Sequence, residues 1–262
     1  MKNEKENGTK IVEIVILTAI GVGASTVVGA IIGFIIGGLS KKAGDVILSF
    51  GAGVMLSAAM LGLILPSLEF GGWRALIVTP LGVVLGGVLI ELLDTLAPRL
   101  EGALIGEPTD DPGEQNRRQK ILLFVMAIAI HNIPEGIASG VAFGTGNIGD
   151  ALLVATSIAL QNIPEGMVLI SPMLSVGITR GRALLYASLT GVVEVLGAFL
   201  GYFTVSISSA LLPFFLSLAG GCMVYVIADE MIPETHRDGS GRGASFALIF
   251  GFLLMVVFDV LV

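Results

Sequence analysis

The chain is a succession of long apolar runs separated by short polar connections. Each run approaches or exceeds the roughly 20 apolar residues that a helix needs to cross a bilayer. The pattern of a membrane β-barrel, short segments of alternating hydrophobicity, is absent from the sequence. We therefore expect an all-α polytopic membrane protein with eight transmembrane helices in a single domain, residues 1–262. The expected spans are residues 11–39, 46–66, 75–97, 121–143, 151–173, 183–206, 213–232 and 244–262.

Two of these runs are interrupted by nearly the same polar hexapeptide. The first is His131–Gly136 (HNIPEG) and the second is Gln161–Gly166 (QNIPEG), which differ only at the first position. Polar and charged side chains at this depth are costly in hydrocarbon, so the pair indicates a function.

Helical geometry gives each hexapeptide a polar face. Residues four apart share a face, so His131 lies beside Glu135, and Gln161 lies beside Glu165. The turn between the two helices is expected near residues 146–147, which places 131 level with 161 and 135 level with 165. The faces then meet near the bilayer midplane and offer one imidazole, two carboxylates and three amides. This mixed set suits a divalent transition metal better than an organic substrate.

Further polar residues lie at depth or near the helix ends. Glu194 is in the middle of a span, where a lone carboxylate costs several kcal/mol (roughly 3) unless it has a partner. We interpret it as a third carboxylate facing the motif pair, the alternative being a packing carboxylate bonded to Ser or Thr. Asp229 and Glu230, followed by His236, suggest a position that binds a cation on its way to the cytoplasm. The alternative is that they are solvated charges at the membrane interface. Asp259, near the chain end, would be an end cap or an entrance charge.

Composition and charge agree with a membrane protein. The 262 residues are 54% hydrophobic and only 13% charged, with a mean hydropathy of +0.94. A net charge of −7 argues against nucleic acid as a partner. The single cysteine, Cys222, excludes an intramolecular disulfide and a multi-thiolate metal site.

The distribution of basic residues predicts the orientation. Of the 14 Lys and Arg residues, ten follow the first, third, fifth and seventh spans, and four lie on the other side. By the positive-inside rule both termini are outside, and the long polar loop 98–120 is cytoplasmic. The motif pair has three spans before it and three after it. This 3+2+3 layout hints at the inverted repeats of transporters, whose substrates bind at midplane.

At these residues the chain resembles the ZIP (Zrt/Irt-like) family of divalent metal transporters, prokaryotic type. The resemblance covers nearly the whole chain, and rests on the paired motifs and on Glu230–His236 (EMIPETH). It implies homodimers and a two-metal centre on spans 4 and 5. It also implies that spans 1, 4, 5 and 6 move against a scaffold of 2, 3, 7 and 8.

The resemblance also implies ligand sets. One site would use His131, Glu135, Gln161 and Glu165, with Met55 as a further ligand. The neighbouring site would use Asn132, Glu135, Asn162, Glu165 and Glu194, with Glu135 and Glu165 bridging. Asp229, Glu230 and His236 would line the inner release path.

The chain departs from the family pattern at three positions. Asn162 stands where relatives commonly have a carboxylate, which removes a negative charge from the second site. Gln161 stands where many eukaryotic relatives have His, and Asp229 where His often precedes the Glu.

The sequence thus predicts uptake of a divalent cation across the cell inner membrane, passive or ion-coupled, by alternating access. Zn²⁺ is the expected substrate, with Cd²⁺, Fe²⁺ and Mn²⁺ as further candidates, and no organic cofactor is expected. Because His131 must be neutral to ligate, binding should weaken as the pH falls towards about 6.

Two alternatives remain open. A metal-selective channel would use the same ligands. An intramembrane metallohydrolase is the rival from another class, since His131-x-x-x-Glu135 has part of the zinc-protease pattern. That chemistry needs His-Glu-x-x-His, and the second histidine is missing here, so we expect no enzyme.

Overall fold

A computed structural model describes residues 2–36, 40–104, 129–130, 132–175, 178–207, 209–236 and 241–261. Within these ranges the chain forms helices joined by short turns, without a β-strand. Seven of the helical segments described are long and apolar enough to cross a membrane. The predicted class, an all-α polytopic membrane protein, is confirmed.

Long helices make up most of the structure. They are α1 (Lys2–Ile35), α2 (Lys41–Ser57), α4 (Ala75–Leu104), α6 (Ile148–Ser175), α7 (Arg180–Ile207), α8 (Leu212–Val226) and α10 (Gly241–Leu261). Residues 132–142 are also helical and carry most of the first motif. Helix α4 continues past Pro98 to Leu104, so the start of the predicted loop 98–120 is helical instead. Residues 105–120 of that loop lie outside the described residues.

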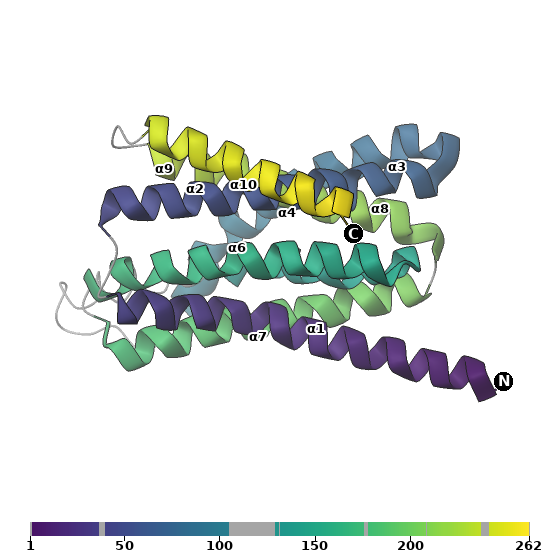
Figure 1. Cartoon of the computed structure of the whole chain (residues 1–262), viewed down its shortest axis with the longest axis horizontal. Helices are drawn as coiled ribbons and strands as arrows, with labels where there is room; N and C mark the ends of the chain where they lie inside the picture. Colours follow the sequence, from purple (N-terminus) through teal and green to yellow (C-terminus); the bar gives the residue numbers. More distant parts are fainter. Residues whose placement is uncertain are drawn as a thin grey trace.

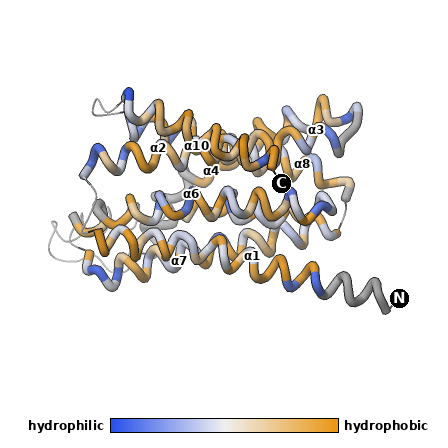
Figure 2. Tube along the Cα trace, in the orientation of Figure 1, coloured by the Kyte–Doolittle hydropathy of each residue, from blue (hydrophilic) through white to orange (hydrophobic). Residues whose placement is uncertain are grey.

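The helices form two groups (Figure 1). Helix α1 packs against α6 and α7, whereas α2 packs against α10 and α4 packs against α8. Helix α2 also packs against α6 and so joins the groups. Hydrophobic residues cover the long helices, and hydrophilic residues concentrate near several helix ends (Figure 2). Large apolar side chains are exposed along α1, α4, α7 and α10, as expected of surfaces that contact lipid tails.

Local sequence signals explain two of the helix boundaries. Ser40 caps α2, and its side chain accepts a hydrogen bond from the amide of Ala43 at 3.3 Å. Gly146 has φ 79°, a left-handed conformation that suits glycine, and it ends the 3-10 turn η3 (Phe143–Thr145). This turn joins the two motif helices where the sequence predicts it, next to Asn147.

Two helices contain π-helical turns. Turn η1 (Ala58–Ile64) joins α2 to α3 (Leu65–Gly71), which η2 (Gly72–Arg74) connects to α4. Turn η5 (Ile227–Met231) joins α8 to α9 (Ile232–His236), and η4 (Ser209–Leu211) precedes α8. In both cases the second residue of the following α-helix is a proline, Pro66 or Pro233. Proline has no backbone N–H, so it cannot donate the regular hydrogen bond of an α-helix. Such turns are frequent at functional sites.

Glycines bring neighbouring backbones close to the motifs. A Cβ at Gly136 would clash with the carbonyl oxygen of Glu194, and one at Gly166 would clash with that of Thr26. The last residue of each motif therefore sets the distance to the next helix, which is α7 for the first motif and α1 for the second.

Candidate metal centre

The two motifs lie in the interior of the helix bundle. Asn132, Glu135, Gln161 and Asn162 are almost completely buried, with exposed fractions of 0–1%. Glu165 is half-buried, and His131 lies outside the described residues. The first motif is on the helix 132–142 and the second is on α6, which runs unbroken through it.

A hydrogen bond joins the two motifs directly. The side-chain amide of Gln161 donates from Nε2 to Oε1 of Glu135 at 2.5 Å. The bond connects residues from different helices in a water-poor interior, where a hydrogen bond is electrostatically stronger than in water. The first position of the second motif thus positions the carboxylate of the first.

A second amide–carboxylate pair lies beside the first. Asn162 donates from Nδ2 to both carboxylate oxygens of Glu194, at 2.7 and 2.9 Å. The same nitrogen lies 3.4 Å from the carbonyl oxygen of Val22. Helices α1, α6 and α7 therefore meet at Asn162, and the predicted third carboxylate is in contact with the second motif.

Several amide oxygens remain available in this interior. Asn132 Oδ1, Gln161 Oε1 and Asn162 Oδ1 are buried, and none has a hydrogen-bond partner among the residues described. Buried polar atoms in proteins are nearly always satisfied, so exceptions indicate a functional role or a bound group. Amide oxygens next to carboxylates suit a cation.

Two of the carboxylates each accept a hydrogen bond from an amide. No group of three or more His, Cys, Asp or Glu side chains in the described ranges is close enough to hold a metal ion. Gln161 lies against Glu135, and Asn162 lies against Glu194. A cation at this centre would have to use amide oxygens as well as carboxylates.

Met55 lies on the face of α2 that packs against α6. A Cβ at Gly51 would lie 3.6 Å from the Cβ of Pro164 and 3.7 Å from the carbonyl oxygen of Gln161. Met55 is one helical turn further along the same face and is fully buried. Met55 is therefore one helical turn away from the residue of α2 that lies beside the second motif, and it packs in the hydrophobic core.

The residues assigned to a release path lie on separate elements, η5 and α9. Asp229 is exposed and Glu230 is half-buried. Both ring nitrogens of His236 have hydrogen-bond partners: Nδ1 lies 2.9 Å from the carbonyl oxygen of Ile232, and Nε2 lies 3.1 Å from Ser245 Oγ. A cation that binds His236 through Nε2 must replace the bond to Ser245.

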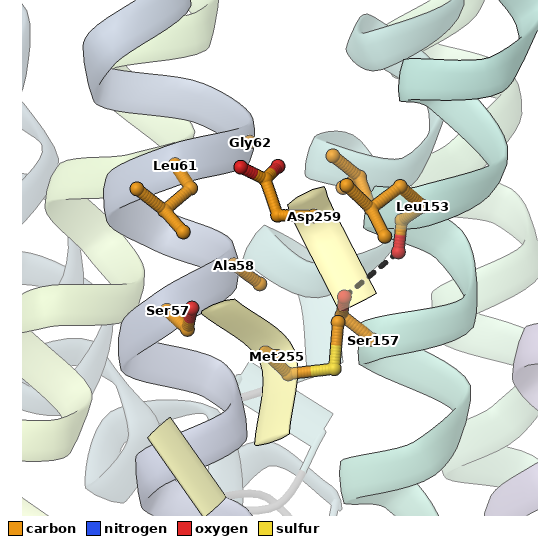
Figure 3. A pocket seen from close by; sticks show the side chains of 9 residues that line it. Ser57, Ala58, Leu61, Gly62, Leu153, Ser157, Met255 and Asp259 are labelled. Carbon is orange, nitrogen blue, oxygen red and sulfur yellow. Dashed lines mark hydrogen bonds between the residues drawn. The ribbon is translucent and has the colours of Figure 1, made fainter. Parts of the chain in front are cut away.

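A small pocket lies between α2, η1, α6 and α10 (Figure 3). Its polar lining consists of Ser57, Ser157 and the carboxylate of Asp259. Ser157 is one helical turn before Gln161 on α6, so the pocket lies on the side of α6 that leads to the second motif. The hydroxyl of Ser157 donates to the carbonyl oxygen of Leu153 at 2.7 Å.

Sequence reasoning missed several of these polar residues. Ser57, Ser157 and the buried Thr26 were not singled out, because a lone hydroxyl in an apolar helix is common and usually bonds to its own backbone. The spacing of Ser157 to Gln161 was a usable signal, since it continues the polar face of the motif by one turn.

Buried carboxylates and amides at the centre of a many-helix bundle define a class, the polytopic membrane proteins that handle ions. The family profile described as "ZIP Zinc transporter" matches residues 106–259. The chain belongs to the ZIP zinc transporter family, as the motifs predict, and is a transporter rather than an enzyme.

Curated relatives resemble the chain over most of its length. It is 38% identical over 243 residues to the zinc transporter GufA of Myxococcus xanthus, covering 90% of this chain and 94% of the relative. It is 37% identical over 246 residues to the zinc transporter ZIPB of Bordetella bronchiseptica, covering 90% and 77%. It is 31% identical over 248 residues to the zinc transporter ZupT of Chlorobium chlorochromatii, covering 90% and 92%.

Proposed function

We propose that the protein carries divalent transition-metal cations, foremost Zn²⁺, across the cell inner membrane towards the cytoplasm. The observation that carries the proposal is the contact between the two buried motifs through Gln161 and Glu135. The relatives named above are zinc transporters, which supports the choice of metal. Cd²⁺, Fe²⁺ and Mn²⁺ fit the same ligand types and are secondary substrates.

The primary site uses His131, Glu135, Gln161 and Glu165, with the thioether of Met55 as a further ligand. Carboxylates offset the cost of moving a divalent cation out of water. An imidazole and an amide oxygen keep binding selective but reversible, which a carrier needs.

The neighbouring position draws on the bridging carboxylates Glu135 and Glu165, on Asn132 and Asn162, and on Glu194. The oxygens of Glu135 and Glu194 accept hydrogen bonds from side-chain amides, and these bonds must break before the oxygens can bind a metal. Rotation of the Gln161 side-chain amide by half a turn would present its unpartnered Oε1 in place of Nε2. The amide is thus a donor to Glu135 without metal and an acceptor for the cation with metal.

The path to and from the centre follows from the orientation that the basic residues favour, with both termini outside. The pocket with Asp259 is then the entrance, one turn of α6 before Gln161. Asp229, Glu230 and His236 belong to the exit on the cytoplasmic side.

The proposal includes a 3+2+3 arrangement of eight spans and a homodimer in the lipid bilayer. Alternating access would move α1, α6, α7 and the helix 132–142 against the group that contains α2, α4, α8 and α10. The packing of α1 on α6 and α7, and of α2 on α10, supports this division.

Zinc uptake into proteoliposomes tests the proposal. We expect Glu135→Ala and Glu165→Ala each to lower uptake at least tenfold, whereas Glu13→Ala, an exposed glutamate of α1, transports like the parent. Parent-like uptake by both motif variants would refute the site. Flux that saturates at low metal concentration indicates a carrier, and non-saturating, voltage-driven current would indicate a channel.

A further inference from the structure

The hairpin between α3 and α4 presents a tryptophan and an arginine at its tip. Trp73 and Arg74 belong to the 3-10 turn η2, which joins the two helices. Trp73 is 75% exposed, and Arg74 is exposed as well. The hairpin lies at the same end of the bundle as the N-terminus (Figure 1). Both side chains therefore face the surroundings of the protein and not its interior.

Two buried hydroxyl groups hold the hairpin closed. Ser67 Oγ on α3 and Thr79 Oγ1 on α4 lie 2.9 Å apart, and these residues have exposed fractions of 0% and 3%. Ser67 also donates to the carbonyl oxygen of Ile64 at 2.7 Å. Since Ser67 has a single hydroxyl hydrogen, Thr79 is the donor to Ser67. The turn that carries Trp73 and Arg74 thus joins two helices that are bonded to each other.

Trp73 and Arg74 are in contact with one another. The guanidinium carbon of Arg74 lies 5.7 Å from the centroid of the Trp73 ring, within the range of a cation–π interaction. In the described part of the chain no carboxylate pairs with Arg74, although the exposed Glu69 is close to it in sequence. The five N–H donors of the guanidinium group can therefore bind an anion from outside the protein.

Apolar side chains adjoin this pair on α4. Leu76 and Ile77 follow directly after Arg74, and both are largely exposed. The apolar segment of α4 that is long enough to cross a membrane begins at Ala75. In a bilayer such a surface is covered by hydrocarbon tails. Trp73 and Arg74 therefore lie at the level where the tails meet the headgroups, a region that tryptophan prefers.

Arg74 is the exception on its side of the membrane. Among the connections after the second, fourth and sixth predicted spans, residues 67–74, 144–150 and 207–212, it is the only basic residue. The charge bias that orients a membrane protein depletes this side of Lys and Arg. Orientation thus does not account for the arginine, and we attribute it to a local anionic ligand.

We propose that Trp73 and Arg74 bind the headgroup of an anionic phospholipid such as phosphatidylglycerol. Arg74 donates to the phosphate, whose geometry fits the planar fork of a guanidinium group. The Trp73 ring covers the region between phosphate and tails, and Leu76 and Ile77 contact the acyl chains. The apolar surface that continues from the pair favours a lipid over a free phosphate ion. The lipid would hold α4, and α8 which packs on it, at a fixed depth in the bilayer.

Fluorescence of the purified full-length chain in a non-ionic detergent tests the proposal. Trp73 is the only tryptophan of the chain, so its emission reports on this site alone. The probe is phosphatidylglycerol with brominated acyl chains, because bromine quenches indole fluorescence on contact. Diacylglycerol with the same brominated chains lacks the phosphate and is the comparison lipid. We expect half-maximal quenching at an about fivefold lower concentration of phosphatidylglycerol than of diacylglycerol, the effect of one basic residue beside anionic lipid.

Variants of Arg74 assign this preference to its side chain. Arg74→Gln should abolish it, so that both lipids quench at the same concentration, whereas Arg74→Lys should keep part of it because the charge remains. Arg242→Gln, at an exposed arginine of α10, is the matched control and should behave like the parent. If Arg74→Gln does not fold, Arg74→Met makes the same test with an uncharged side chain.

Three results would overturn the proposal. One is a parent that both lipids quench equally or not at all, which would make Trp73 an apolar anchor or a residue outside the lipid. Another is a preference that persists in Arg74→Gln. The third is full reversal of the quenching by inorganic phosphate, which would identify a site for free anions. None of these results bears on metal transport, because the lipid site does not depend on which ion is carried.

Discussion

Asn162 holds both carboxylate oxygens of Glu194 through a single amide nitrogen, at 2.7 and 2.9 Å. Both residues are fully buried, and they come from different helices, α6 and α7. A buried carboxyl group needs such a donor, a cation or a bound proton. This pair therefore couples the packing of the central helices to the chemistry of the proposed metal centre.

Removing the donor should destabilise the protein. Asn162→Leu leaves Glu194 buried without its amide, and we expect a loss of about 1–3 kcal/mol, seen as a lower unfolding temperature in detergent. Asn162→Asp should also destabilise the metal-free protein, because two carboxylates then face each other. Excess Zn²⁺ should restore the aspartate variant and not the leucine variant. Equal responses of the two variants to Zn²⁺ would contradict the account.

Close backbone approach at the motif glycines gives a second prediction. Gly166→Ala places a Cβ against the carbonyl oxygen of Thr26, which is backbone and cannot rotate away. We expect a loss of about 1–3 kcal/mol in stability and reduced zinc uptake. Gly21→Ala on α1 is the matched control, since its Cβ would meet open space. If both variants unfold at the parental temperature, the contact between α1 and α6 is looser than described.

The pocket that we propose as the entrance gives a third prediction. Asp259→Asn should raise the KM for zinc a few-fold at low ionic strength, and the difference should shrink as salt screens the charge. Asp150→Asn is the control, because Asp150 is exposed in the first turn of α6 and does not line the pocket. A KM for Asp259→Asn that stays at the parental value in low salt would show that the pocket is not the entrance.

The sequence predicted the class of fold well, because apolar runs and the cost of buried charge are local signals. The turn at Gly146 and the contact of Glu194 with the second motif were both predictable in this way. The pairing of each amide with its carboxylate was not predictable. That pairing depends on how closely the glycines let the helices approach one another. The place of Thr26 beside the second motif was likewise not predictable, since it depends on the close approach of Gly166 to the carbonyl oxygen of Thr26.

The helix ends show a different limit. The apolar run that contains Glu91 ends near residue 97, yet α4 continues to Leu104. Beyond the apolar region a polar helix and a loop have similar composition, so hydropathy gives the span and not the full helix. The π-helical turns before Pro66 and Pro233 were also not predicted. A proline in a long apolar run does mark a point where the backbone hydrogen bonds of the helix must be interrupted.

The central claim is that a metal ion sits between the two motifs. Anomalous diffraction from zinc-soaked crystals of the full chain tests it most directly. The account predicts the strongest peak within ligand distance of Glu135 and Glu165, bounded by His131 and Gln161. Zinc found only near Asp229 and His236, or only at the surface, would contradict it.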